Sequence, residues 1–306
     1  MSRPKESAPT ARRPSLWGAE RRQVFEALYG SVQYAYGMQV EGDVIEFGTM
    51  SGDTAALLAE AIAACDRLLA PRYGPVHGAP KTLWLLDSFK GLPEAEAEAD
   101  RSAPHVRAGV WAAATCRGIS PALLAKKVAR HLPRARSRVV EGWFSDTVPQ
   151  LPAATRFACI HVDCDLYAST VDALGPLFAR DQVADGAVIL FDDWNCNRAS
   201  PLYGQRKAWN ELVLRHRIRF SDEGRYGIAS RRFIVHGYER APVPVGAGGD
   251  AGAHAANAAQ AEIAALTTAL AETRRQLAER EAELAAAATE MAQIRQLHTA
   301  ARRRQR

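Results

Sequence analysis

From residue 43 onward, the apolar positions form short continuous runs separated by longer stretches with helical spacing. Runs of about four to eight apolar residues between turn residues are typical of strands buried on both faces of a sheet. We predict five such strands: VIEF (44–47), TLWLLDSF (82–89), SRVVEG (137–142), FACIHVD (157–163) and AVILFDD (187–193). Helices are predicted around them, at 19–40, 54–70, 94–132 with an interruption near Gly118–Pro121, 170–180 and 205–216.

This alternation of strand and helix predicts an α/β domain with a mostly parallel sheet and right-handed crossovers. Two further segments, 217–223 and 231–239, have the pattern of an antiparallel pair at the end of the domain. The expected fold is therefore a seven-stranded sheet with helices on both faces and an antiparallel terminal pair. We place this domain at residues 19–240.

The segments outside the domain differ from it in composition. Residues 1–18 are polar and contain three prolines, which predicts a disordered tail. Pro, Gly and Ala dominate 241–258, which we predict to be a linker. Between 259 and 300, apolar residues recur every seven positions, which predicts a coiled-coil helix; they are Ile263, Leu270, Leu277, Leu284 and Met291. The second heptad position is mixed, so a single surface helix is the alternative.

Charge and composition limit the partners and the location. The net charge is +5, and five arginines without an acid lie in 295–306, so that 301–306 form a basic tail. We interpret the basic ends as solvated, because no nucleic-acid motif accompanies them. No apolar run approaches the ~20 residues of a membrane span. The chain has five cysteines, an odd number, and no CxxC pair. Its N-terminus lacks the apolar core of a signal peptide. Both features predict a cytoplasmic protein.

A glycine turn follows the first predicted strand, and ligands of open parallel sheets bind beyond the carboxyl ends of the strands. The turn, EFGTMSGDT at 46–54, allows close approach of a ligand to the backbone and to the next helix N-terminus. It lacks the GxGxxG spacing of a nicotinamide dinucleotide site. Asp87 closes the second strand, where an acid can accept both hydrogen bonds of a ribose diol. The alternative for the glycine turn is a purely structural role. The alternative for Asp87 is an acid that caps a helix or lies in a loop.

Four carboxylates end two other strands. Asp163 and Asp165 follow the fourth strand, and Asp192 and Asp193 follow the fifth. Their repulsion and desolvation would be costly without a cation. Oxygen ligands favour Mg²⁺, with Mn²⁺ or Ca²⁺ as alternatives. Helix capping explains one or two of these acids, but it does not explain four at two strand ends.

Residues two apart in an extended segment face the same side, so Asp163 and Asp165 can both face the cleft. One of them could bind the metal while the other accepts a proton. His161 shares this phase but lies deeper in the strand, and we interpret it as a core or supporting residue.

The chain resembles the macrocin O-methyltransferase family in four blocks: VIEFGTMSGDT, LLDSFKGLP, VVEGWFSDTVP, and IHVDCDLYASTVDAL with its follower VILFDDW. The resemblance covers roughly 43–236 and implies a Rossmann-like class I methyltransferase that uses S-adenosylmethionine (SAM) and Mg²⁺. Three positions depart from the family pattern: Lys90, Asp53 and Trp194. The coiled coil lies outside the resemblance.

The resemblance also implies a role for individual residues. At the methionine end of SAM it implies Glu46, Gly48 and Thr54, with Phe47 and Thr49 of the same block. At the ribose it implies Asp87, Ser88 and Phe89. Near the adenine it implies Trp143, Ser145 and Asp146. For the metal it implies Asp163, Asp192 and Asp193, with Asp165 as the general base.

The expected activity is methyl transfer to a hydroxyl of a vicinal diol, on a sugar of a small molecule or glycan. Segment 94–132 is expected to form a lid, with His105, Arg107 and Trp111 as candidate acceptor contacts or ordinary packing residues. The heptad segment predicts a homo-oligomer or a coiled-coil partner. Methylation of a catechol-type phenol and a non-catalytic scaffold are the alternative functions.

Overall fold

The computed structural model describes residues 16–68 and 80–239. The predicted linker, coiled coil and basic tail, and nearly all of the predicted N-terminal tail, lie outside this range. The strands are β1 (Asp43–Phe47), β2 (Leu83–Asp87), β3 (Ser137–Glu141), β4 (Phe157–Val162), β5 (Val183–Phe191), β6 (Arg219–Tyr226) and β7 (Ser230–Gly237). The helices are α1 (Leu16–Gly37), α2 (Asp53–Leu68), α4 (Glu98–Arg101), α5 (Pro104–Arg107), α6 (Pro121–Val128), α7 (Phe144–Thr147), α8 (Tyr167–Ala179) and α9 (Gly204–His216), with 3₁₀ turns η1 (Arg134–Arg136), η2 (Val148–Gln150) and η3 (Asn197–Ala199).

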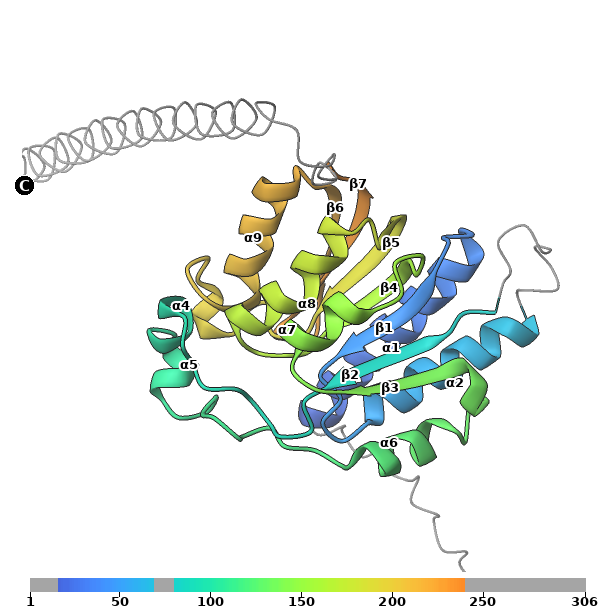
Figure 1. Ribbon diagram of the computed structural model, residues 1–306, viewed down its shortest axis with the longest axis horizontal. Helices are drawn as coiled ribbons and strands as arrows, with labels where there is room; N and C mark the ends of the chain where they lie inside the picture. The colour runs from blue at the N-terminus through green and yellow to red at the C-terminus, as the bar shows by residue number, and fades with distance from the viewer. Residues whose placement is uncertain (1–15, 69–79, 240–306) are drawn as a thin grey trace, which may run out of the picture. The chain divides into compact units, whose positions relative to one another are not determined.

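The strands form one sheet in the order β3-β2-β1-β4-β5-β7-β6 (Figure 1). The first five strands along the chain run parallel to one another, whereas β7 runs antiparallel to both β5 and β6. Every residue of β4 is buried, as its continuous apolar run predicts. The predicted seven-stranded, mostly parallel sheet with an antiparallel terminal pair is confirmed.

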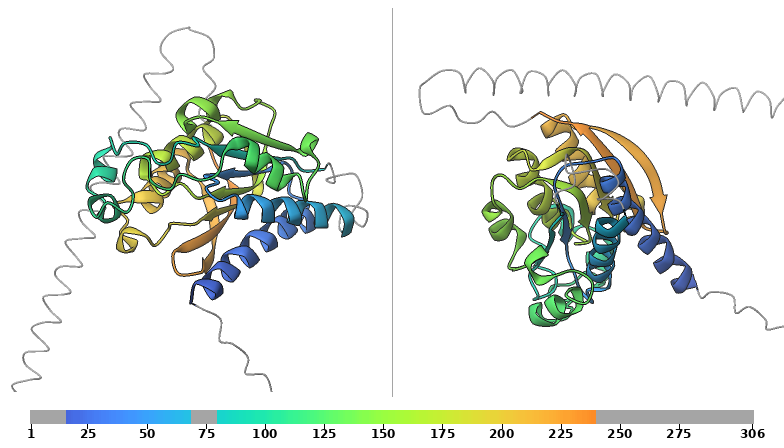
Figure 2. Two further views of the ribbon diagram at one scale, coloured as in Figure 1. Left: turned by 90° about the horizontal axis from the view of Figure 1, so that it is seen from below. Right: turned by 90° about the vertical axis from the view of Figure 1, so that its right-hand side faces the viewer.

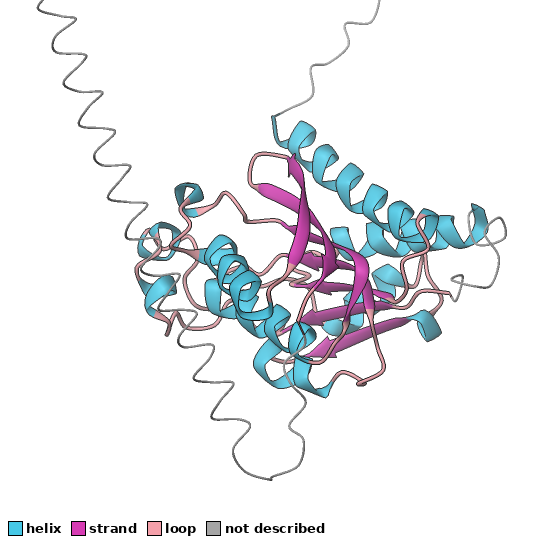
Figure 3. Ribbon diagram, turned by 90° about the horizontal axis from the view of Figure 1, so that it is seen from above, coloured by secondary structure: helices cyan, strands magenta, loops and turns pink. Residues whose placement is uncertain are grey.

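Helices cover both faces of the sheet (Figure 3). On one face, α1, α2 and α6 pack over a cluster that contains Val44, Ile62 and Leu83. On the other face, α8 and α9 pack over a cluster that contains Phe178, Phe191 and Trp209. Helix α1 runs alongside α2, and the terminal strands β6 and β7 extend the sheet at the far edge (Figure 2).

The stretch 94–132 differs from its prediction, because it is mostly not helical. It contains two four-residue helices, α4 and α5, and the eight-residue α6. Between α5 and α6 the backbone takes left-handed conformations at Gly109, Ala114 and Cys116, which end any helix there. Backbone hydrogen bonds to other loops hold this conformation: the Ala114 N–H donates to the Leu92 carbonyl at 2.9 Å, and the Ile119 N–H donates to the Met50 carbonyl at 2.9 Å. Helix α1 also begins at Leu16, three residues before the predicted start.

The register of the parallel strands brings their carboxyl ends to one edge of the sheet. Phe47 lies opposite both Leu86 and Val162, and Val162 lies opposite Phe191. The residues that follow these positions therefore meet at one edge.

Among the described helices, none is long and apolar enough to cross a membrane.

Candidate active site

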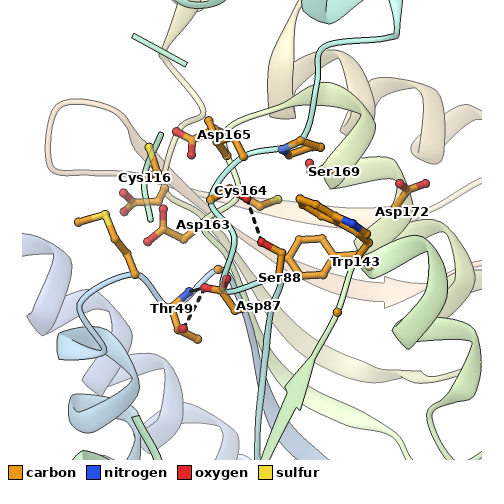
Figure 4. Close-up of a pocket in the computed structure, with 18 of the residues that line it drawn as sticks. Thr49, Asp87, Ser88, Cys116, Trp143, Asp163, Cys164, Asp165, Ser169 and Asp172 are labelled. Carbon is orange, nitrogen blue, oxygen red and sulfur yellow. Dashed lines mark hydrogen bonds between the residues drawn. The ribbon is translucent and has the colours of Figure 1, made fainter. Parts of the chain in front are cut away.

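A cavity of about 380 Å³ lies at the carboxyl edge of the sheet. Figure 4 shows Asp163, Asp165 and Cys116 at one end, Trp143, Ser169 and Asp172 at another, and Thr49 and Asp87 below them. Most of the predicted SAM positions line this cavity: Gly48, Thr49, Thr54, Asp87, Ser88, Trp143 and Ser145. Of the predicted metal and base residues, Asp163, Asp165 and Asp192 line it as well.

The glycine turn is fixed by a close contact between strands β1 and β4. Gly48 has φ +86°, and a Cβ at this position would lie 1.8 Å from the Asp163 carbonyl oxygen. No side chain fits such a contact, so only glycine lets the turn pass beneath the cavity. The turn is thereby tied to the strand end that carries the carboxylates.

Asp87 faces the cavity and also holds the turn. Its Oδ2 accepts hydrogen bonds from the Thr49 backbone N–H at 2.7 Å and the Thr49 hydroxyl at 2.9 Å. Its Oδ1 accepts one from the Phe89 N–H at 2.7 Å. A carboxylate has about four acceptor sites, so these three bonds leave one site for a ligand hydroxyl.

The Trp143 end of the cavity combines an aromatic ring with polar groups. Trp143 is the N-cap residue of α7, and Phe144, the first residue of α7, packs edge-on against Phe47 with ring centroids 5.3 Å apart. Ser169 and Asp172 face this end from α8. Burial raises the pKa of Asp172, and the nearby charge of Asp146 adds to this effect. The region therefore has a flat apolar wall beside hydrogen-bonding groups.

Three carboxylates converge at the other end. One carboxylate oxygen from each of Asp163, Asp192 and Asp193 lies within 4.8 Å of the other two. Asp165 adjoins them, and its backbone N–H donates to Asp193 Oδ2 at 3.1 Å. Four acids from two strand ends thus share one small region, as the sequence predicts.

Polar residues from other elements hold these carboxylates in place. Gln205 of α9 accepts from the Asp193 N–H at 2.9 Å and donates to Asp193 Oδ2 at 3.2 Å. It also donates to the Val162 carbonyl at 2.9 Å, which links the ends of β4 and β5. The Ser230 hydroxyl donates to Asp192 Oδ1 at 3.1 Å. Both supporting residues are 1% exposed.

The clustering has a clear electrostatic effect. Burial raises the pKa values of Asp163 and Asp193, and the charges of the neighbouring acids raise them further. Burial also raises the pKa of Asp165 to about 7, with a contribution from Asp192 and an opposing hydrogen bond from Cys116. A divalent cation would offset this repulsion, and an all-oxygen set at this spacing fits a hard cation such as Mg²⁺.

Four predicted SAM residues do not line the cavity: Glu46, Phe47, Phe89 and Asp146. Glu46 is fully buried behind it, and its Oε1 lies 2.9 Å from His161 Nδ1. His161 is therefore a core residue, as its depth in the strand indicates. The other oxygen of Glu46 and Nε2 of His161 have no hydrogen-bond partner among the described residues.

The segment between β2 and α6, residues 88–120, forms one wall of the cavity, and we call it the insertion. It contributes Gly91, Leu92, Pro93 and Cys116 to the lining. The three candidate acceptor contacts do not line the cavity. Trp111 is buried against Leu92 and Leu166, and His105 stacks on Trp111 with ring centroids 4.6 Å apart. Packing is thus the role that the geometry gives to Trp111 and His105, while Arg107 lies on the surface.

Sequence reasoning missed several residues of the site. Cys116, Phe144, Ser169 and Asp172 line the cavity, and Gln205 and Ser230 support the carboxylates. Ser169 and Asp172 lie one helical turn apart, within a block that the resemblance covers, so their spacing offered a signal. Cys116, Gln205 and Ser230 carried none, because only the folded chain brings them to this edge.

The chain was compared with known proteins. The profile of the family described as Macrocin-O-methyltransferase (TylF) matches residues 10–217. The chain belongs to the macrocin O-methyltransferase family.

The chain is 31% identical over 165 residues to 8-demethyl-8-(2,3-dimethoxy-alpha-L-rhamnosyl)-tetracenomycin-C 4'-O-methyltransferase of Streptomyces olivaceus. The match covers 51% of this chain and 54% of the relative. It is also 31% identical over 174 residues to demethyldecarbamoylnovobiocin O-methyltransferase of Streptomyces niveus, covering 55% and 59%. The chain thus spans somewhat more than half the length of these relatives.

Solved structures support the fold assignment. The O-methyltransferase NovP superposes with a TM-score of 0.53 at 23% identity, covering 71% of this chain and 79% of NovP. The calicheamicin methyltransferase CalS11 superposes with a TM-score of 0.51 at 23% identity, covering 70% and 78%. The predicted Rossmann-like class I methyltransferase fold is confirmed for the described domain.

Proposed function

We propose that this protein is a SAM- and Mg²⁺-dependent O-methyltransferase that modifies a hydroxyl of a vicinal diol on a sugar. One observation carries the proposal: a single cavity joins the glycine turn and Asp87 to a cluster of three carboxylates with Asp165 beside it. Family membership and the methyltransferase fold support it.

For SAM, the proposal uses the lining residues in chain order. Gly48, Thr49 and Thr54 would contact the methionine portion, Asp87 and Ser88 the ribose, and Trp143 and Ser145 the adenine. SAM supplies a methyl group activated on a sulfonium. The task of these residues is to orient that methyl toward the carboxylate end of the cavity, since positioning can contribute about 7–11 kcal/mol to lowering the barrier.

For the metal, the proposal assigns Asp163, Asp192 and Asp193 as ligands. A bound Mg²⁺ lowers the pKa of a coordinated hydroxyl and fixes its direction. Asp165 adjoins the cluster and lines the cavity, so its carboxylate can take the hydroxyl proton as methyl transfer proceeds. Gln205 and Ser230 hold the ligand carboxylates while this occurs.

A sugar acceptor is supported by the names of relatives. One is a 4'-O-methyltransferase of a rhamnosyl-bearing compound, and another is mycinamicin III 3''-O-methyltransferase of Micromonospora griseorubida, 28% identical over 198 residues. Both names place the methylated oxygen at a primed position, and the first names a rhamnosyl group. We therefore propose a glycosidic sugar of a natural product or surface glycan as the acceptor.

We also propose the domain division given by the sequence, with a methyltransferase domain at 19–240 and an oligomerising coiled coil at 259–300. The heptad spacing of Ile263 to Met291 supports the second part. The coiled coil would join copies of the chain in the cytoplasm.

The test of the activity is an assay with methyl-labelled SAM against a panel of glycosides with vicinal hydroxyls, with catechol included. Transfer to a glycoside that EDTA abolishes and Mg²⁺ restores is the expected result. Transfer to catechol alone would overturn the sugar assignment. Transfer that is insensitive to EDTA would overturn the metal requirement.

A further inference from the structure

Asp100 is a buried acid of the insertion that the proposed chemistry does not use. It lies in α4 and is 1% exposed. Its Oδ1 accepts a hydrogen bond from the Tyr167 backbone N–H at 2.8 Å, and its Oδ2 accepts one from the Ala168 N–H at 3.0 Å. A carboxylate with both oxygens engaged in this way is a strong, charge-assisted acceptor for backbone N–H groups.

The two N–H groups that Asp100 accepts begin helix α8. The first N–H groups of a helix have no partner within it, and a polar residue just before the helix usually accepts one of them. Here that position is Leu166, whose side chain makes no capping hydrogen bond. A carboxylate 67 positions away along the chain therefore caps α8.

Helix α8 directly follows the loop that carries the catalytic candidates. Asp163 and Asp165 lie just before Leu166, and Asp165 has a left-handed φ of +61°. Leu166 is 1% exposed because it packs with Leu92 and Trp111 of the insertion. The insertion thus holds this loop through both a cap and a small apolar cluster.

A second contact ties the insertion to the loop after β5. The His105 backbone N–H donates to Asn197 Oδ1 at 2.9 Å, and the Asn197 N–H donates to His105 Nδ1 at 3.1 Å. Asn197 begins three consecutive left-handed residues, Asn197–Ala199. Such a run is costly for residues other than glycine and persists only where contacts hold it. Both carboxylate-bearing loops are therefore fastened to the insertion.

We propose that Asp100 is a positioning residue: by capping α8 from the insertion, it holds the Asp163–Asp165 loop in its catalytic conformation. Docking of the insertion and ordering of this loop are then one event. The catalytic part of this inference rests on the proposed function, whereas the cap itself does not.

The test uses the full-length chain and three variants. Asp100→Ala removes both acceptors, and Asp100→Asn keeps one carbonyl oxygen. The matched control is Glu98→Ala on the same short helix, whose side chain is 77% exposed and pairs only with Arg101 among the described residues. Four quantities are measured: amide hydrogen exchange at Tyr167 and Ala168, Mn²⁺ affinity by electron paramagnetic resonance, kcat, and SAM affinity.

The expected results depend on how many side-chain oxygens at position 100 can still accept a hydrogen bond from the Tyr167 and Ala168 N–H groups. Asp100→Ala speeds exchange at the two amides, weakens Mn²⁺ binding and lowers kcat, each by about tenfold or more, the factor for a lost charge-assisted hydrogen bond. Its SAM affinity stays at the wild-type value, because the two residues that Asp100 caps, Tyr167 and Ala168, are not among those assigned to SAM. Asp100→Asn falls between Asp100→Ala and wild type, and Glu98→Ala matches wild type in all four quantities.

Two results would overturn the proposal. Unchanged exchange at Tyr167 and Ala168 in a folded Asp100→Ala or Asp100→Asn variant would reject the cap. Faster exchange with wild-type Mn²⁺ affinity and kcat would reject the positioning role. The exchange readout does not depend on methyl transfer, so failure of the proposed activity would leave the test of the cap intact.

Discussion

At the residue scale, the site depends on side chains whose backbone and neighbours are fixed by other groups. Asp165 takes a left-handed backbone conformation that Asp and Asn tolerate better than most residues. Its N–H is held by Asp193, and the thiol of Cys116 contacts its carboxylate. A substitution that preserves shape and backbone preference can therefore test the role of the carboxylate alone.

Asp165→Asn meets this requirement. We expect kcat to fall by about 10²–10⁴-fold, the usual contribution of a general base, while affinities for SAM and Mn²⁺ are retained. Steady-state kinetics and calorimetry measure these quantities. Asp185→Asn, at an exposed position near the start of β5, is the control that keeps full activity. An Asp165→Asn variant with wild-type kcat would rule out Asp165 as the base.

The carboxylate cluster predicts a stability change on metal binding. Mg²⁺ at about 100 times its dissociation constant should raise the free energy of unfolding by about 2.7 kcal/mol. Asp192→Ala removes one ligand and should lose both this increase and methyl transfer. Urea denaturation with Mg²⁺ and with EDTA measures the effect. If wild-type stability is the same under both conditions, no cation binds at this cluster.

At the element scale, close backbone contacts and inter-helix ion pairs fix the loops of the site. Gly48 lets the turn after β1 lie against the end of β4. At the start of α2, Asp53 forms ion pairs with Lys127 of α6 and Arg21 of α1, so three helices meet there. Asp53, which departs from the family pattern, therefore joins helices and does not line the cavity.

Gly48→Ala should destabilise the fold strongly. The added methyl collides with the Asp163 carbonyl and the left-handed backbone is disfavoured, so we expect a loss of about 2–5 kcal/mol from overpacking and strain together. Gly30→Ala is the matched substitution, since nothing lies within 4 Å of a Cβ there and Gly30 is inside α1. It should stabilise the protein by about 0.5–1 kcal/mol. Urea denaturation of both variants checks the opposite signs.

The Asp53 ion pairs predict a response to acid. The hydrogen bond from Lys127 is the main cause that lowers the pKa of Asp53 in the folded protein, against the opposing effect of burial. Its stabilisation is therefore present above about pH 4, the ordinary pKa of Asp, and is lost as pH falls through the folded-state value. Both side chains are about one-third exposed, so the effect should be below about 1 kcal/mol.

Asp53→Asn should remove this part of the pH dependence of unfolding between pH 5 and about 2. An unchanged acid profile in that variant would contradict the prediction.

At the scale of the whole molecule, we propose separate roles for the domain and the heptad segment. Every residue of the candidate site lies within the described range, and the two large core clusters lie on either face of its sheet. The heptad positions from Ile263 to Met291 lie outside that range. The domain therefore carries the proposed chemistry, and the heptad segment carries the proposed self-association.

Removal of residues 241–306 tests this division. We expect the shortened chain to keep methyl transfer and to run as a smaller species, since coiled-coil pairing depends on the apolar heptad positions. Light scattering after size-exclusion chromatography measures the mass of both chains. An unchanged number of copies per particle would show that the heptad segment does not set the oligomer.

The sequence by itself determined the sheet and the convergence of its acids. Continuous apolar runs predict strands buried on both faces, and their parallel order places Asp87, Asp163 and Asp192 at one edge, because all parallel strands end on the same side. These are local patterns combined with one topological rule.

Tertiary structure alone decided which groups support the site. Glu46 pairs with His161 behind the cavity, Gln205 holds Asp193, and Asp100 caps α8. These contacts join segments between 12 and 115 positions apart along the chain. The insertion likewise differs from the helix predicted over most of 94–132, because only α4, α5 and α6 form there. A buried polar group takes its partner from whichever element folds beside it, and no local pattern records that partner.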